Sequence, residues 1–386
     1  MSYPRSAQRL YGLDSLRALA IIVVLIYHYR VVVSREPLFG FMSELGWAGV
    51  DLFFVLSGYL IGNQVLGALA RNEDFSLRRF YARRFFRTLP NYYVVLALCL
   101  LVPALNGKDT APLWSFLSFT QNLAMRPGET FTHSWSLCIE EQFYLLFPLA
   151  ALLLLRRFRS PLAGWVVLAV GSLAAMALRM VMLERHGGAD IGALDYYQYI
   201  YYTSVTRFDE LLPGIAIALL KNFHRDTFAR LLEHGQKLLL VGIALVAFAF
   251  YGFQNYWYRG GIGVDTFWTT CGYSLLTWGF ALLVLSALSP KSWLHRARIP
   301  GAASIAVWSY ALYLIHKPLF KLLKEPVGDA GFSVDGYAGM AIILAVSITA
   351  GWLLFRTVET PFMRMRSRLV PSNVRAPAPV TAAVSG

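Results

Sequence analysis

The sequence has few charged residues. Asp, Glu, Lys and Arg make up 15% of its 386 residues, whereas hydrophobic residues make up 57%. Apolar runs of roughly 20 residues, the length that crosses the hydrocarbon core of a bilayer, recur along the whole chain. The composition therefore predicts a polytopic membrane protein with little chain left for a soluble domain.

Cysteines and internal repeats are also scarce. The three cysteines, Cys99, Cys138 and Cys271, lie in or next to apolar runs, far apart and without paired spacing. This pattern predicts neither a disulfide framework nor a metal site. The chain shows no repeat of fixed period, and its halves do not echo each other, which disfavours a transporter built from inverted repeats.

The apolar runs predict an all-α fold, a polytopic membrane helix bundle with about ten transmembrane helices. The first run exceeds the apolar region of a signal peptide and lacks a small-residue cleavage site, so we expect a retained anchor helix. We expect the membrane-embedded domain to occupy residues 10–365 and a short disordered cytoplasmic tail to occupy 366–386. The ten expected spans lie near residues 13–33, 47–68, 89–105, 135–155, 162–183, 203–220, 238–256, 267–288, 303–320 and 338–357.

Lysine and arginine gather in alternate connecting segments, most densely in residues 71–87. This bias predicts that both termini are cytoplasmic. It also accounts for the formal net charge of +13, so no nucleic-acid partner is needed. The partners expected from composition are membrane lipids.

Several expected spans carry ionisable residues in the leaflet opposite the cytoplasm. Any one of them is explained by contact with lipid headgroups, but the set favours a shared polar cavity, because buried charge is costly in lipid. Arg207 and Asp209 either pair with each other or bind an acceptor, and His316 is either a helix boundary or a glycan contact. The residues are His28, Asp51, Glu140, Glu141, Arg207, Asp209, Glu210 and His316.

Arginines dominate the cytoplasmic leaflet. Arg17 lies eleven residues before His28, or about 16 Å along a helix. Arg84 and Arg87 are three residues apart and share a helical face, and guanidinium groups suit phosphate oxygens. Plain positive-inside decoration also explains these arginines. Near the last span, Glu359 is expected to pair with a neighbouring arginine.

Six stretches in this order are similar to the acyltransferase 3 family of integral-membrane O-acyltransferases, and the resemblance spans about residues 10–365. They are "LDSLRALAIIVVLIYHY", "GWAGVDLFFVLSGYLIG", "FYARRFFRTLP", "HSWSLCIEEQFYLLFP", "TRFDELLPGIAIA" and "SYALYLIHKPL". The resemblance implies transfer of an acyl group, often acetyl, from cytoplasmic acyl-CoA to a hydroxyl on a surface or exported sugar. It also implies a bacterial inner membrane. Some members carry a further periplasmic hydrolase-like domain, which we do not expect here. A one-domain member would reach its acceptor either without help or with a separate protein.

The resemblance also implies roles for single residues. The R-x10-H motif falls on Arg17 and His28, the RxxR motif on Arg84 and Arg87, and the WSL-x-x-E element on Trp135, Ser136 and Glu140, with His133 before it. We expect acetyl-CoA or another acyl-CoA as co-substrate, with no tightly bound cofactor. Arg17, Arg84 and Arg87 would hold it, and the acceptor would contact Trp135, Ser136, Arg207, Asp209 and His316.

Acyl transfer to a hydroxyl profits from a general base, and His28 is the candidate. A carboxylate would steady the imidazolium that forms, and the sequence does not choose between Glu140 and Asp51. An acyl-histidine intermediate is the minority alternative. Two other classes stay open: a multi-span transporter of a sugar or anionic substrate, and a lipid-linked glycosyltransferase using Glu36 and Glu44. Neither the acceptor nor the oligomeric state follows from the sequence.

Overall fold

The computed structural model describes residues 10–158, 160–256 and 264–373, and all regular structure in these ranges is helical, as the composition predicts. The helices are α1 (Tyr11–Tyr29), α2 (Phe41–Leu45), α3 (Gly49–Ala70), α4 (Leu77–Leu101), α5 (Leu113–Leu117), α6 (Trp135–Phe158), α7 (Pro161–Arg185), α8 (Ala193–Tyr196), α9 (Ser204–Arg207), α10 (Leu212–Phe223), α11 (Arg225–Glu233), α12 (Gly235–Tyr256), α13 (Tyr273–Leu288), α14 (Trp293–Arg296), α15 (Ala302–Asp329), α16 (Tyr337–Leu354) and α17 (Thr360–Leu369). Short 3-10 or π-helical segments extend or connect them: η1 (Arg30–Ser34), η2 (Gly46–Ala48), η3 (Pro103–Leu105), η4 (Gln121–Leu123), η5 (Thr132–Ser134), η6 (Gly188–Asp190), η7 (Tyr197–Tyr201), η8 (Phe208–Leu211), η9 (Trp268–Gly272) and η10 (Phe355–Glu359).

Within the described residues, 7 helical stretches are long and apolar enough to cross a membrane. The other three expected spans differ from these in composition or length: α4 begins in an arginine-rich stretch, α15 carries His316, Lys317 and Lys321, and α10 has only 12 residues. The predicted count of about ten is therefore not established. The candidate spans are Tyr11–Ser34, Phe41–Ala70, Thr132–Leu154, Pro161–Arg185, Gly235–Asn255, Trp268–Leu288 and Tyr337–Leu369.

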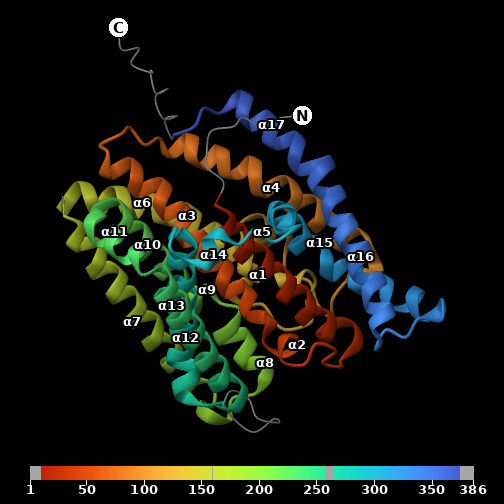
Figure 1. The fold of residues 1–386 in the computed structure, drawn as a ribbon. Coiled ribbons are helices and arrows are strands. Elements are labelled where there is room, and N and C mark those ends of the chain that lie inside the picture. Colours follow the sequence, from red (N-terminus) through yellow and green to blue (C-terminus); the bar gives the residue numbers. More distant parts are fainter. Residues whose placement is uncertain (1–9, 159, 257–263, 374–386) are drawn as a thin grey trace.

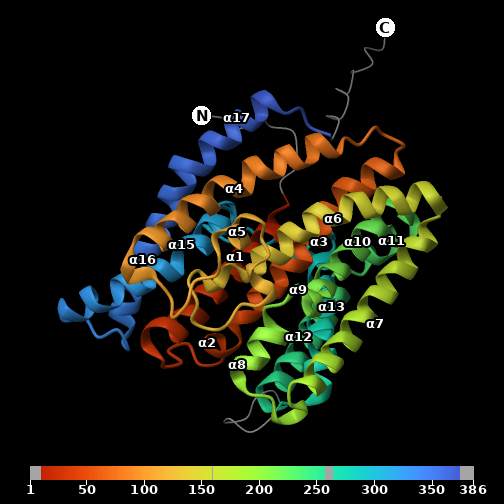
Figure 2. The same cartoon turned by 180° about the vertical axis from the view of Figure 1, so that it is seen from behind.

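Helix α1 occupies the middle of the bundle (Figure 1). It packs extensively against α15 and α3, while α3 packs against α10, α12 against α13, and α15 against α16. In the reverse view, α4 runs across the upper part of the bundle, and α6 and α7 lie below it towards the right (Figure 2). Because α1, α3, α4, α6 and α15 meet around one interior, side chains from distant parts of the sequence are brought together there.

Two glycines let α3 and α10 approach closely. A Cβ at Gly58 would overlap the carbonyl oxygen of Leu211, and a Cβ at Gly214 would overlap that of Val55. Small residues at such contacts allow backbones to touch inside membranes. The pair therefore fixes the position of Ser57, the residue next to Gly58.

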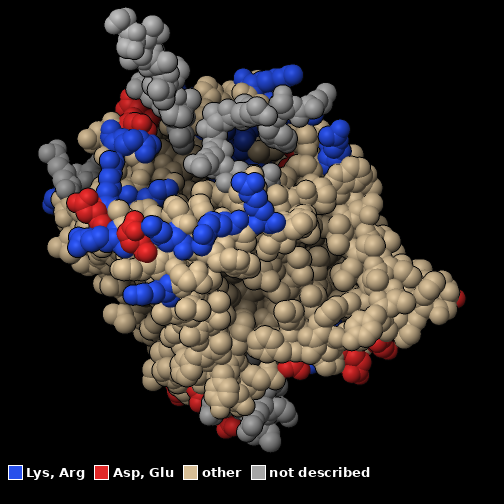
Figure 3. Space-filling model, viewed as in Figure 1, with Lys and Arg blue, Asp and Glu red and all other residues tan. Residues whose placement is uncertain are grey.

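Charge is distributed unevenly over the molecule. Lys and Arg side chains gather at the end that carries α17, called here the basic end, with a few acidic side chains among them, whereas the opposite end of the same view shows acidic side chains and hardly any Lys or Arg (Figure 3). Helix α17 continues to Leu369, and most of the tail expected over 366–386, from residue 374 onward, lies outside the described residues.

Candidate functional site

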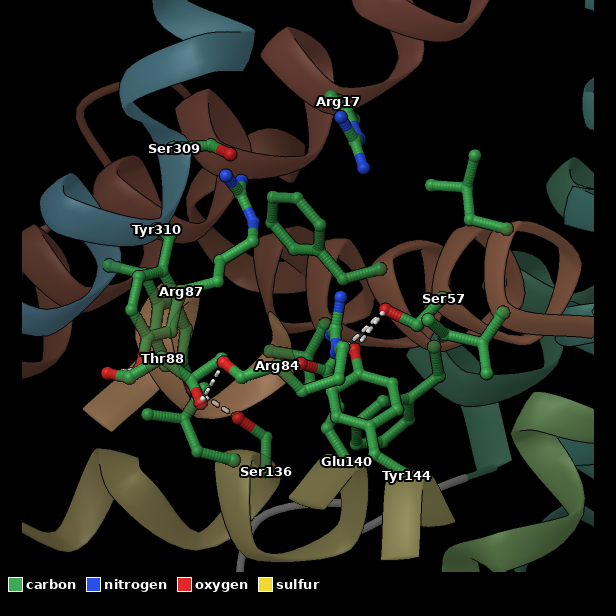
Figure 4. Close-up of a pocket in the computed structure, with 17 residues that line it drawn as sticks. Arg17, Ser57, Arg84, Arg87, Thr88, Ser136, Glu140, Tyr144, Ser309 and Tyr310 are labelled. Carbon is green, nitrogen blue, oxygen red and sulfur yellow. Dashed lines mark hydrogen bonds between the residues drawn. The ribbon is translucent and has the colours of Figure 1, made fainter. Parts of the chain in front are cut away.

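A pocket of about 110 Å³ lies in the interior where α1, α3, α4, α6 and α15 meet. We call it the arginine pocket, because Arg17, Arg84 and Arg87 all line it (Figure 4). The structure therefore brings together the three arginines that the sequence assigned to the donor. Its other lining residues are Val50, Phe53, Phe54, Ser57, Leu60, Ile61, Thr88, Ser136, Leu137, Glu140, Tyr144, Ser309, Tyr310 and Tyr313.

The arginines of α4 are held by neighbours from other helices. The guanidinium of Arg84 lies 3.8 Å from the centre of the Tyr144 ring, and Arg87 Nη1 lies 3.2 Å from Glu359 Oε1. The ion pair confirms the expected arginine partner of Glu359. Helix α4 is capped by Ser76, which accepts from the Arg79 N–H. These contacts fix both side chains of the RxxR motif on one face of α4.

Glu140 lies in the arginine pocket. Its Oε1 accepts a 2.6 Å hydrogen bond from Ser57 Oγ, which itself accepts from the Tyr144 hydroxyl at 3.0 Å. Ser136, also in this wall, shares a 2.6 Å hydrogen bond with the hydroxyl of Tyr313. Glu140 is therefore placed beside the arginines of the pocket and not beside His28.

A second pocket, of about 390 Å³, lies on the side of the arginine pocket away from the basic end. We call it the histidine pocket, because His28 and His133 line it, with Trp135 and Lys317. Val50 lines both pockets, so they are neighbours. The other lining residues are Tyr27, Val31, Val32, Trp47, Cys99, Leu105, Pro127, Gly128, Glu129, Phe131, Thr132, Tyr197, Tyr201, Tyr202, Pro318 and Lys321.

His28 is held by another histidine. His28 Nδ1 lies 3.0 Å from Nε2 of the fully buried His316, and the ring of His133 packs 5.2 Å from that of His316. Among the described residues, no carboxylate hydrogen-bonds to His28, and no group of three or more His, Cys, Asp or Glu is arranged to hold a metal ion. The carboxylate partner expected for His28 is therefore replaced by His316, which lies behind His28 rather than in the pocket.

The loop before α6 lines part of the histidine pocket. Phe131 adopts a left-handed backbone conformation, with φ of 58°, and Ser134 N–H bonds to its carbonyl. Such a conformation is uncommon for a residue with a bulky side chain and often marks a functional site. Glu129 lines the pocket in the same loop, and burial raises its pKa.

Asp51 and Arg207 belong to a buried ion-pair cluster. Arg207 Nη2 lies 2.9 Å from Asp51 Oδ1, and its Nε pairs with Glu210. The guanidinium also faces Tyr273, 4.0 Å from the ring centre. Pairing and aromatic contact together offset the cost of burying this charge.

Asp209 has a different partner from the expected one. Arg179, fully buried on α7, forms a two-pronged ion pair with Asp209 at 2.7 and 3.0 Å. Of the two alternatives left open for Arg207 and Asp209, their pairing with each other is therefore wrong, because the short 3-10 helix η8 directs Asp209 to α7 while Arg207 pairs with Asp51 on α3. Neither residue lines any of the three pockets described here.

A third pocket, of about 420 Å³, opens at the basic end. Five cationic side chains line this basic pocket, and it shares Leu60 and Arg84 with the arginine pocket. The three pockets therefore lie next to one another in a row, from the basic end to His28. The lining residues are Leu60, Asn63, Gln64, Arg71, Phe80, Arg83, Arg84, Lys221, Asn222, Arg366 and Ser372.

Sequence reasoning missed two tyrosines of the site. Tyr144 lies four residues after Glu140 and Tyr313 three residues before His316, so each shares a helical face with a residue that was singled out. Tyr144 contacts Arg84, and the Tyr313 hydroxyl donates to the carbonyl of His133 at 2.7 Å. The helical spacing from Glu140 and His316 was the sequence signal that could have identified these two tyrosines.

Fold and site together define a multi-helix membrane protein whose interior holds cationic pockets next to a histidine pocket. Its sequence matches the model of a family described as "Acyltransferase domain" over residues 10–356. Since the match covers most of the chain, the protein belongs to this family, which confirms the resemblance found in the sequence.

Curated relatives carry related names. The chain is 28% identical to "Peptidoglycan O-acetyltransferase OatA" of Listeria monocytogenes, over 92% of this chain and 56% of the relative. It is 27% identical to "O-acetyltransferase OatA" of Staphylococcus aureus, over 93% of this chain and 58% of the relative. The chain thus spans less than two thirds of these proteins' length. No solved structure matches it.

Proposed function

We propose that the protein is a membrane O-acyltransferase that moves an acetyl group from acetyl-CoA to a hydroxyl of a surface or exported glycan. The observation that carries the proposal is the series of three pockets, which runs from a cationic opening past Arg17, Arg84 and Arg87 to His28. Family membership and the names of the relatives support the same reaction. The proposed location is the inner membrane of a bacterium.

The donor enters from the basic end. Coenzyme A carries phosphate groups at one end and the thioester at the other. Arginine forks bind phosphate oxygens through paired, charge-assisted hydrogen bonds, and the basic pocket presents Arg71, Arg83, Arg84, Lys221 and Arg366. The thioester end then extends through the arginine pocket towards the histidine pocket. No cofactor is held permanently in this scheme.

The acceptor enters the histidine pocket, which is lined by tyrosines, Trp135 and Lys317. His28 takes the proton of the acceptor hydroxyl as its oxygen forms a bond with the thioester carbonyl carbon. The carbon–sulfur bond breaks, and the proton on His28 passes to the thiolate that leaves. The products are the O-acetylated glycan and free coenzyme A.

The first test is equilibrium binding of acetyl-CoA to the purified protein in lipid nanodiscs, which needs no acceptor. We expect the Arg84→Ala, Arg87→Ala variant to bind at least about tenfold more weakly, because each charge-assisted bond contributes about 1.5–3 kcal/mol. His28→Ala should bind like wild type and lose transfer. The matched control is Arg225→Ala, Arg230→Ala, which removes the same charge from α11, outside the three pockets.

The outcomes separate the classes of protein. Saturable binding that depends on Arg84 and Arg87, but not on the α11 arginines, supports a donor held at the arginine pocket. A folded wild-type protein that binds no acyl-CoA contradicts the proposal and favours the transporter alternative. Equal weakening in both double variants would mean that only overall charge attracts the donor.

A further inference from the structure

His28 and His316 form a pair whose hydrogen positions are fixed by their surroundings. His316 lies on α15 and is fully buried, and its Nε2 faces His28 Nδ1 across 3.0 Å. His28 alone of the two lines the histidine pocket. The ring of His316 therefore contacts the ring of His28 and not the space where the substrate would lie.

The far side of His316 decides where its proton sits. His316 Nδ1 lies 2.7 Å from the backbone carbonyl oxygen of Tyr313 and 3.2 Å from that of Leu312. Carbonyl oxygens only accept hydrogen bonds, so Nδ1 must carry the hydrogen. In the neutral ring the other nitrogen, Nε2, then has a free lone pair and acts as an acceptor.

The hydrogen-bond pattern of His316 also determines which nitrogen of His28 carries a hydrogen. Because His316 Nε2 accepts, the facing nitrogen, His28 Nδ1, must donate, so it carries the single hydrogen of the neutral His28 ring. The remaining nitrogen, His28 Nε2, is left with a lone pair. The backbone carbonyls of α15 thus act through His316 on the tautomer of His28, whose ring also has a hydrogen bond to the backbone of Val24 on α1.

We propose that His316 is a positioning residue that holds His28 with Nε2 as the basic nitrogen, an inference that rests on the proposed acyl transfer. In other acyl-transfer enzymes a carboxylate orients the histidine base. Here a neutral imidazole, itself anchored by carbonyl groups, takes that place. When His28 accepts the acceptor's proton at Nε2, its Nδ1–H continues to donate to His316, which keeps the ring in place until the proton passes to the thiolate.

Two variants of His316 separate position from packing. In His316→Gln, the amide N–H can donate to the Tyr313 carbonyl while the amide oxygen accepts from His28, so the original pattern survives. In His316→Leu both bonds are lost at similar volume. We expect His316→Leu to lower kcat by about 10² or more, the size of a general-base contribution, with the KM values for both substrates unchanged. His316→Gln should recover most of this loss.

The matched control is His295→Leu on α14, where His295 also bonds to a backbone carbonyl, that of Ala287, but lies outside the three pockets. Full activity in His316→Leu would overturn the proposal. So would a His316→Gln variant as inactive as His316→Leu while it still binds acetyl-CoA.

A spectroscopic measurement tests the tautomer without any acyl transfer. Nitrogen-15 NMR of histidine-labelled protein in nanodiscs distinguishes a ring nitrogen with hydrogen from one without, and His28→Gln assigns the His28 signals by difference. We expect His28 to carry hydrogen on Nδ1 alone in wild type and on a mixture of nitrogens in His316→Leu. Hydrogen on Nε2 in an active wild type contradicts the assignment alone. The expected tautomer in a protein that transfers no acyl group supports the assignment and contradicts the proposed function.

Discussion

At the scale of single residues, the arginine pocket depends on contacts that hold flexible cations still. A guanidinium on a long side chain loses rotamer freedom when it binds, so a ring that fixes it beforehand improves affinity. Tyr144 does this for Arg84, because the guanidinium lies 3.8 Å from its ring centre. The Tyr144 hydroxyl does not take part in this contact and instead donates a hydrogen bond to Ser57.

Tyr144 therefore gives a test with a built-in control. Tyr144→Leu removes the ring and the hydroxyl, whereas Tyr144→Phe removes the hydroxyl alone. We expect Tyr144→Leu to raise the Kd for acetyl-CoA by about 2- to 30-fold, the range that corresponds to a cation–π contact of about 0.5–2 kcal/mol. Tyr144→Phe should change it much less. Equal effects of the two variants, measured by calorimetry in nanodiscs, would assign the contribution to the hydroxyl.

Arg207 contributes to stability rather than to the pockets. Arg207→Met would leave the fully buried Asp51 and Glu210 without their cation. Breaking a buried pair from one side costs about 3–5 kcal/mol, so we expect a clearly lower midpoint of thermal unfolding in detergent. Arg230→Ala, at an exposed position on α11, should leave the midpoint unchanged. A Met variant as stable as wild type would show that the two carboxyl groups are held neutral.

The sequence predicts which residues belong to the site better than it predicts which residues they contact. Helical geometry predicts that Arg17 and His28 lie at different depths of one helix and that Arg84 and Arg87 share one face of another. The structure places Arg17, Arg84 and Arg87 in one pocket. Partners such as His316 for His28, 288 residues away, depend on which helices touch. No local pattern contains that information, so the sequence offers Glu140 and Asp51 as partners of His28, whereas the structure pairs them with Ser57 and Arg207.

At the scale of helices, the contact between α3 and α10 positions both ends of the site. Helix α3 supplies Asp51 to the buried cluster and Ser57 to the arginine pocket, and η8, just before α10, supplies Glu210. The glycines at the contact let the two backbones touch. A shift of α3 would therefore disturb the cluster and the pocket together.

Gly58→Ala tests this dependence. The added methyl group would overlap the carbonyl oxygen of Leu211, a backbone atom that moves only with its helix. We expect lower thermal stability together with weaker acetyl-CoA binding, because Ser57 moves with Gly58. The control is Gly328→Ala on α15, where a Cβ would meet nothing within 4 Å. A Gly58→Ala variant that is stable and binds normally would show that α3 and α10 separate without consequence for the pocket.

The expected spans with one uniform apolar run match candidate spans, among them α1, α3 and α6 of the site, whereas the site helices α4 and α15 do not. The run expected over 203–220 is divided into α9, η8 and α10, because Arg207, Asp209 and Glu210 turn inward where a straight helix would present them to lipid. Two stretches missing from the candidate spans serve the site: α4 carries Arg84 and Arg87, and α15 carries His316 and Lys317. Functional residues lower the apolar signal on which span prediction rests.

At the scale of the whole molecule, the separation of charge bears on orientation. Lys and Arg gather at the basic end and are scarce at the opposite end (Figure 3), and the basic pocket opens at the basic end. Cytoplasmic segments of membrane proteins carry an excess of Lys and Arg. The basic end is therefore expected to face the cytoplasm, where acyl-CoA is made, and the histidine pocket to face the other side.

Single cysteines at two exposed aspartates test the orientation. Asp74 lies between α3 and α4 at the basic end, and Asp329 ends α15 on the opposite side. In intact cells, a membrane-impermeant maleimide should label Asp329→Cys at once and Asp74→Cys only after the membrane is permeabilised. Cys99→Ser and Cys271→Ser remove the background, because Cys99 lines the histidine pocket and Cys271 is half-buried, whereas Cys138 is buried outside the pockets. The reverse labelling order would place the cationic opening away from cytoplasmic acyl-CoA, and the donor path would then have to run from the histidine pocket.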